Sequence, residues 1–140
     1  MRLVLDTDVI VAGIRSPSGA SAALLSLVLA GRGTMLLSVA LAFEYEATCS
    51  RPEHRLAAKV SEAEVGNLMD VIADVAEPVL VDYLWRPQLR DAGDELVLEA
   101  AVNGRADAIV TFNRRDYGAA PSQFGIEVLS PGDALRRVRP

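Results

Sequence analysis

Four acidic residues lie near the ends of expected β-strands in this 140-residue sequence: Asp6, Glu44, Asp94 and Asp116. The carboxyl ends of parallel strands meet at one edge of a sheet, where ligands bind, so these carboxylates are expected to converge. Converging carboxylates repel one another more strongly as the local dielectric constant falls. Because few basic residues lie near these positions in the sequence, a divalent metal ion is the favoured way to relieve that repulsion.

Each acidic residue also has a structural explanation. Asp6, at the end of a strand, suits a helix cap or a turn as well as a ligand. Asp94 belongs to an acidic group at a helix start, where the helix dipole favours negative charge, and Asp116 lies in a turn-forming segment. Glu44 would lie about 9 Å along a helix that begins after Ser38. The equivalent topological position of all four residues favours one shared site.

Alternating strands and helices are expected to position these residues. Strands are predicted over residues 2–5, 34–38, 108–111 and 126–129, with a short extended segment at 78–81. Helices are predicted over residues 40–49 and 91–104, from 21 with Ser21 as its cap, from 61 with a Ser61–Glu64 capping box, and from 130 onward. This alternation indicates a three-layer, Rossmann-like α/β fold, a parallel sheet sandwiched by helices. Residues 1–140 are expected to form a single domain.

Composition narrows the possible functions. The net charge of −5 argues against a nucleic-acid coat protein, whose affinity would come from neutralised phosphates. It leaves open an enzyme that acts on nucleic acid, because the acidic excess includes the expected metal site. Every basic residue except Lys59 is an arginine, and arginine forks suit phosphate. Several arginines are grouped: Arg51 with Arg55, Arg86 with Arg90, Arg114 with Arg115, and Arg136 with Arg137 and Arg139. For any one group, solvated surface charge is the favoured interpretation over a phosphate contact.

Other familiar chemistries lack their residues. The one histidine, His54, lies in an expected polar turn, and the sequence has neither a glycine-rich phosphate loop nor a Cys/His zinc cluster. The one cysteine, Cys49, has no partner for an internal disulfide. The longest apolar stretch, 22–30, is too short to span a bilayer, which needs about 20 residues. A soluble cytoplasmic protein with no membrane contact is expected.

The ordered motifs together resemble the PIN-domain family, in particular the bacterial VapC-like toxin ribonucleases. The resemblance extends from residues 4–9 to 128–131 and includes the segments 37–44, 51–52, 91–98 and 108–117. It implies an acidic quartet of Asp6, Glu44, Asp94 and Asp116. It also implies supporting polar residues: Thr7, Ser38, Thr111 and Asn113.

Two positions depart from the family pattern. Asp8 stands where the family commonly carries asparagine or serine, and it adds charge beside the site. Asn113 stands where many relatives have aspartate, so the fourth acidic position falls to Asp116. The aromatic residues Phe112 and Tyr117 flank this position, with base stacking as one role and core packing favoured for Phe112.

The resemblance implies hydrolysis of RNA phosphodiester bonds with Mg²⁺ or Mn²⁺. Asp6 and Asp94 are assigned to the better-held ion, while Glu44 and Asp116 would place a second ion or orient water. The implied partners are an RNA substrate and a small antitoxin that inserts a segment into the acidic groove, as in type II toxin–antitoxin pairs. A homodimer is also implied, with the apolar helices over 20–30 and 61–76 as candidate contacts.

Two alternatives differ in class. The domain could be a catalytically idle module that holds RNA or protein. It could also be a haloacid dehalogenase-like phosphatase with Asp6 as nucleophile and Asp8 as acid/base. Against the phosphatase, Lys59 lacks a strand context, and Leu98 replaces the last aspartate of the Gly-Asp-x-x-x-Asp motif that would begin at Gly93.

Overall fold

A parallel sheet forms the centre of the molecule. The computed structural model describes residues 1–82 and 89–140. Within these ranges five strands pair in parallel in the order β3-β2-β1-β4-β5. They are β1 (Arg2–Leu5), β2 (Thr34–Leu37), β3 (Glu77–Pro78), β4 (Ala108–Val110) and β5 (Glu127–Leu129). The central strands are buried aliphatic runs, as expected of strands covered on both faces.

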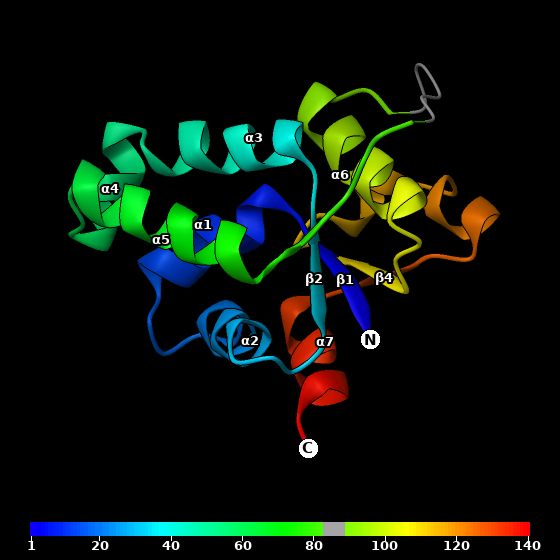
Figure 1. The fold of residues 1–140 in the computed structure, drawn as a ribbon, viewed down its shortest axis with the longest axis horizontal. Coiled ribbons are helices and arrows are strands. Elements are labelled where there is room, and N and C mark those ends of the chain that lie inside the picture. Colours follow the sequence, from blue (N-terminus) through cyan, green and yellow to red (C-terminus); the bar gives the residue numbers. More distant parts are fainter. Residues whose placement is uncertain (83–88) are drawn as a thin grey trace.

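Helices connect successive strands and cover the sheet (Figure 1). The chain moves outward from β1 to β2 through α1 (Thr7–Arg15) and α2 (Ala20–Leu29), then to β3 through α3 (Val39–Cys49), α4 (Pro52–Ala58) and α5 (Glu62–Val75). It returns to β4 through α6 (Ala92–Asn103). Because parallel crossovers are right-handed, this change of direction places α6 on the opposite face. The last helix, α7 (Pro131–Val138), packs against α2. The predicted three-layer α/β fold is confirmed.

Local sequence signals explain most helix starts. The Ser61–Glu64 capping box is present with both hydrogen bonds at 3.1 Å. The Ser38 hydroxyl accepts a hydrogen bond from the Leu41 backbone N–H at 3.1 Å and begins α3. The predicted Ser21 cap is wrong: α2 begins earlier, after Gly19, and Ser21 is buried in its first turn.

Two helices are absent from the sequence prediction. The first, α1, follows Asp6 directly and carries the buried residues Val9, Ile10 and Val11 on its inner side. The second, α4, replaces the expected polar turn around His54; Pro52 at its first position suits a helix start. These helices change which residues reach the carboxyl edge of the sheet.

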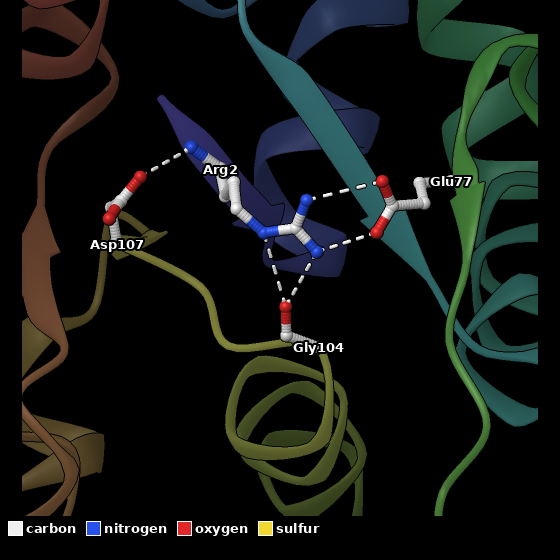
Figure 2. A network of polar contacts seen from close by, with 4 residues as sticks. All are labelled: Arg2, Glu77, Gly104 and Asp107. Atoms are coloured by element: carbon white, nitrogen blue, oxygen red, sulfur yellow. Dashed lines mark hydrogen bonds and ion pairs between the residues drawn. The ribbon is translucent and has the colours of Figure 1, made fainter.

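One arginine links several elements at the amino edge of the sheet (Figure 2). The Arg2 guanidinium donates to both carboxylate oxygens of Glu77 at 3.1 and 2.5 Å, and to the carbonyl of Gly104 at 3.3 and 2.8 Å. The Arg2 backbone N–H donates to Asp107 at 2.7 Å. Arg2 therefore ties β1 to β3, to the end of α6 and to the start of β4.

No single helix within 1–82 and 89–140 has the length and apolar character needed to cross a membrane. Helices α1 and α2 meet those criteria only when taken as a pair, and they are bent by 105° relative to each other.

Candidate active site

A hollow of about 330 Å³ at the carboxyl edge of the sheet brings together three of the four predicted acidic residues. Asp6 follows β1, Glu44 lies on α3, and Asp94 lies in the first turn of α6. Asp8, on α1, lines the same hollow. Carboxylates from four different elements thus share one concavity, as the convergence of strand ends predicts.

The fourth predicted residue, Asp116, lies in a neighbouring pocket of about 650 Å³. It is exposed in a short 3₁₀ helix, η1 (Arg114–Tyr117), that follows β4. Asp91 and Asp94 line both the hollow and the pocket. Asp116 therefore faces Asp94 from the other side and lies outside the hollow that holds Asp6 and Glu44.

Asp6 is the most deeply placed carboxylate, with 7% of its surface exposed. The hydroxyls of Thr111 and Tyr117 donate to its Oδ2 atom at 2.7 and 3.0 Å. Burial raises the pKa of Asp6, and these two hydrogen bonds lower it in part. Asp6 occupies the cap position of α1, but its side chain makes no capping hydrogen bond. The geometry therefore favours a ligand role over the cap.

Asp8 is held by the segment that follows β4. Its Oδ2 atom accepts hydrogen bonds from the Asn113 side-chain amide at 3.0 Å, the Phe112 backbone N–H at 3.2 Å and the Thr111 hydroxyl at 3.4 Å. Burial, followed by the charge of Asp6, raises the pKa of Asp8 to about 6. Its other oxygen, Oδ1, is buried with no hydrogen-bond partner among the described residues.

Two aspartates at the start of α6 have different positions and contacts. Asp91 accepts hydrogen bonds from the backbone N–H groups of Gly93 and Asp94 at 2.7 and 3.2 Å, and so caps the helix. The Asp94 carboxylate is left for the site. Burial raises the pKa of Asp94 to about 7, and the charges of Asp6, Asp91, Asp116 and Asp8 add to that rise.

Gly93 leaves room for the Asp91 cap beside Glu44. A Cβ atom on Gly93 would lie only 3.0 Å from an Asp91 oxygen, whereas its distance of 3.5 Å from the Glu44 Oε1 atom would be an ordinary contact. Glu44 Oε1 also accepts a hydrogen bond from the Thr48 hydroxyl at 3.4 Å, one turn along α3. Glycine at position 93 therefore keeps the capping oxygen of Asp91 free of a close contact.

The predicted supporting residues have different positions. Thr7 lines the hollow. Thr111 donates to Asp6 and accepts a hydrogen bond from the Asn113 backbone N–H at 3.0 Å, while Asn113 holds Asp8. Ser38 acts at a distance, because its hydroxyl caps the helix that carries Glu44.

The sequence did not predict the roles of two tyrosines at the site. Tyr117 is fully buried and donates to Asp6, so its ring is not available for base stacking. Tyr45 is also buried and donates to the Leu5 carbonyl, directly before Asp6. Conversely, the favoured core role for Phe112 is wrong, since 55% of Phe112 is exposed. Nothing in the sequence indicates which way a tyrosine directly after Glu44 or Asp116 points.

The expectation that basic residues are scarce at the site is wrong, because the fold brings basic residues from other parts of the chain to it. Arg51 and His54, brought back by α4, line the acidic hollow. Arg90 and Arg115 line the neighbouring pocket. Arg86, which the sequence grouped with Arg90, lies outside the described residues. Cationic side chains therefore flank Asp94 on both sides.

The hollow offers carboxylate oxygens, the type of ligand that hard divalent ions prefer. Within the described part of the chain, however, no three or more histidine, cysteine, aspartate or glutamate side chains are already arranged to hold a metal ion. Mg²⁺ usually takes only one or two carboxylates directly and keeps several waters, and Mn²⁺ accepts the same oxygen ligands. Asp6 and Asp94, whose pKa values are raised by burial, fit that mode of binding.

Comparison with known proteins identifies the family. The family model for the PIN domain matches residues 2–115, a range that includes Asp6, Asp8, Glu44 and Asp94 and ends one residue before Asp116. No curated protein matches the sequence. The match favours this family over the haloacid dehalogenase alternative and covers far more than half of the chain. This chain therefore belongs to the PIN domain family.

Proposed function

We propose that this protein is a metal-dependent ribonuclease that hydrolyses phosphodiester bonds with Mg²⁺ or Mn²⁺. PIN domains are generally nucleases, and they generally use divalent metal ions. The observation that carries the proposal is the hollow shared by Asp6, Glu44 and Asp94. Burial and neighbouring carboxylates raise the pKa values of Asp6 and Asp94, so the arrangement is costly without a cation and favourable with one.

Each carboxylate has a distinct role in this proposal. A bound divalent ion lowers the pKa of its water and neutralises charge on the phosphate. Asp6, oriented by Thr111 and Tyr117, and Asp94, freed by the Asp91 cap, would hold the ion. Glu44 would accept a proton from, or orient, the attacking water. Asp116, in the neighbouring pocket, would help to place a second ion.

The arginines around the site support a polyanionic substrate. Arg51 lines the hollow on one side of Asp94, and Arg90 and Arg115 line the pocket on the other. Arginine pairs well with phosphate oxygens, so a single strand crossing the site would have phosphate partners before and after the cleaved bond. Phe112, exposed between strand β4 and η1, is available to stack on a base.

Cleavage of a mixed single-stranded RNA pool tests the proposal. The purified protein is incubated with Mn²⁺, Mg²⁺ or EDTA, and Asp6→Asn is run beside the wild type. Asn at position 6 keeps an acceptor for the Thr111 and Tyr117 hydroxyls, so its fold should persist. We expect metal-dependent cleavage that falls by about 100-fold or more in Asp6→Asn. Folded wild-type protein that binds RNA without cutting it would support the idle-module alternative instead.

The toxin role is a further part of the proposal, carried by the resemblance to VapC-like proteins. It implies a small antitoxin that places an arginine among the carboxylates. Expression of the wild type should arrest growth, whereas Asp6→Asn should not. Growth without arrest, together with RNA cleavage in vitro, would separate nuclease activity from toxicity.

Homodimer formation is proposed through α5 and its neighbour α3. Val71 and Val75 on α5 and Val39 and Phe43 on α3 are exposed. The α2 residues that the sequence suggested for a contact are partly committed to the core, as Leu24, Leu25 and Val28 are buried. Light scattering after gel filtration should give the mass of a dimer, and Phe43→Ser should shift it toward the monomer.

A further inference from the structure

We propose that Asp8 is a metal-binding carboxylate of the active site, and that it takes the fourth acidic position that the sequence assigned to Asp116. This inference rests on the proposed function. Asp8 lines the same hollow as Asp6, Glu44 and Asp94, whereas Asp116 lines the neighbouring pocket and is exposed. By position, Asp8 lies in the hollow itself, whereas Asp116 lies in the neighbouring pocket, from which its charge still contributes to the raised pKa values of Asp6 and Asp94.

The two oxygens of Asp8 have separate roles. Oδ2 accepts hydrogen bonds from the Thr111 hydroxyl, the Phe112 backbone N–H and the Asn113 amide, which fix the carboxylate in one orientation. Oδ1 is buried and has no well-formed hydrogen bond among the described residues, although the Val9 backbone N–H lies near enough to lower the pKa of the Asp8 carboxylate. A buried polar atom without a partner is rare in folded proteins and commonly marks the place of a water or an ion. A cation in the hollow would satisfy Oδ1 without disturbing Oδ2.

Asn113 holds Asp8 at the wall of the hollow. The structure joins the two side chains by a hydrogen bond of 3.0 Å from the Asn113 amide to Asp8. The pair therefore contains one amide and one carboxylate, and the carboxylate lines the hollow.

This division of roles allows a sharp substitution. In Asp8→Asn, the amide oxygen can still accept the three hydrogen bonds made by Oδ2, while an NH₂ group replaces Oδ1 and cannot bind a cation. In Asp8→Ala, both roles are lost. Asp74→Asn makes the same chemical change on an exposed position of α5, away from the hollow, and serves as the matched control.

The experiment measures Mn²⁺ binding by electron paramagnetic resonance of the free ion, in protein freed of metal and without RNA. Thermal unfolding in EDTA is measured for the same proteins. We expect Asp8→Asn to unfold at or above the wild-type temperature, yet to bind Mn²⁺ more weakly by roughly tenfold or more. Asp74→Asn should match the wild type, and Asp116→Asn should lose less affinity than Asp8→Asn.

Three results are distinguishable. Wild-type protein that neither binds Mn²⁺ nor cleaves RNA would overturn the proposed function itself. Wild-type Mn²⁺ affinity in Asp8→Asn, with lowered stability in Asp8→Ala, would overturn the present inference and leave Asp8 as an anchor for residues 111–113. A larger loss of affinity in Asp116→Asn than in Asp8→Asn would also overturn it and restore Asp116 as the fourth residue.

Discussion

The acidic site raises the pKa values of Asp94 and Asp8. Burial and neighbouring carboxylates raise the pKa of Asp94 to about 7 and the pKa of Asp8 to about 6, against roughly 3.9 in an unfolded chain. The folded state therefore binds more protons than the unfolded state between these values. By linkage, this contribution makes the metal-free protein lose stability as pH rises through that window.

A pH series on metal-free protein tests this sign. We expect the melting temperature in EDTA to fall by a few degrees, on the order of 5 °C, between about pH 5 and pH 8. Asp94→Asn should flatten the slope because its amide does not ionise. The pKa of Glu77 is lowered by its hydrogen bond to Arg2, so its contribution is lost only as pH falls through the acidic range. A melting temperature that rises across the window would contradict the assignment.

At the scale of elements, the site depends on how each helix begins. Ser38 starts the helix that carries Glu44, Asp91 starts the helix that carries Asp94, and α1 begins at the residue after Asp6. Helix starts thus set the direction of three acidic side chains. The end of α6 matters equally, because Gly104 brings that helix against the sheet and presents its carbonyl to Arg2 (Figure 2).

Two glycines should respond oppositely to alanine. A Cβ atom on Gly104 would lie 2.8 Å from the Ala100 carbonyl oxygen, with Val79 and Leu36 at 2.9 and 3.0 Å. Gly104→Ala should therefore cost roughly 1–3 kcal/mol of unfolding free energy. Gly66, inside α5, has open space around it, so Gly66→Ala should add about 0.5–1 kcal/mol through helix propensity.

Urea denaturation of both variants measures these changes. The pair is matched because each substitution adds one methyl group next to, or within, a helix. Equal stability of Gly104→Ala and Gly66→Ala would contradict the close packing of α6 against β2.

At the scale of the whole molecule, the carboxylates at the two edges of the sheet are compensated to different extents. At the amino edge the Arg2 guanidinium pairs with Glu77, and the Arg2 backbone N–H donates to Asp107. The carboxyl edge gathers Asp6, Asp8 and Asp94, whose pKa values are raised. The net charge of −5 is therefore unevenly distributed, and the repulsion between carboxylates is concentrated at the carboxyl edge.

Divalent ions should stabilise the whole fold through this edge. An ion that binds only the folded state adds about 2.7 kcal/mol at about one hundred times its Kd, or roughly 10 °C in Tm for a chain of this length. Differential scanning fluorimetry with Mg²⁺ or Mn²⁺, against NaCl at equal ionic strength, measures the effect. The gain should largely vanish in Asp6→Asn. An equal gain from NaCl would indicate general screening and contradict a specific site.

The sequence by itself determined the fold class and predicted that Asp6, Glu44 and Asp94 would meet at one edge of the sheet. Aliphatic runs alternating with amphipathic segments are sufficient to predict a parallel sheet, since both periods are local properties of the chain. The topology then requires Asp6 and Asp94 to meet at the carboxyl edge, and the structure places both in one hollow with Glu44.

Only the tertiary structure decided which further side chains face that hollow. Three positions depend on how residues 111–117 fold back against α1. Asp8 lies inside the hollow, Asp116 lies outside it, and Tyr117 donates a hydrogen bond to Asp6. Arg51 and His54 reach the site because α4 forms where a turn was expected. These directions arise from long-range hydrogen bonds and packing between segments far apart in sequence, which local patterns do not encode.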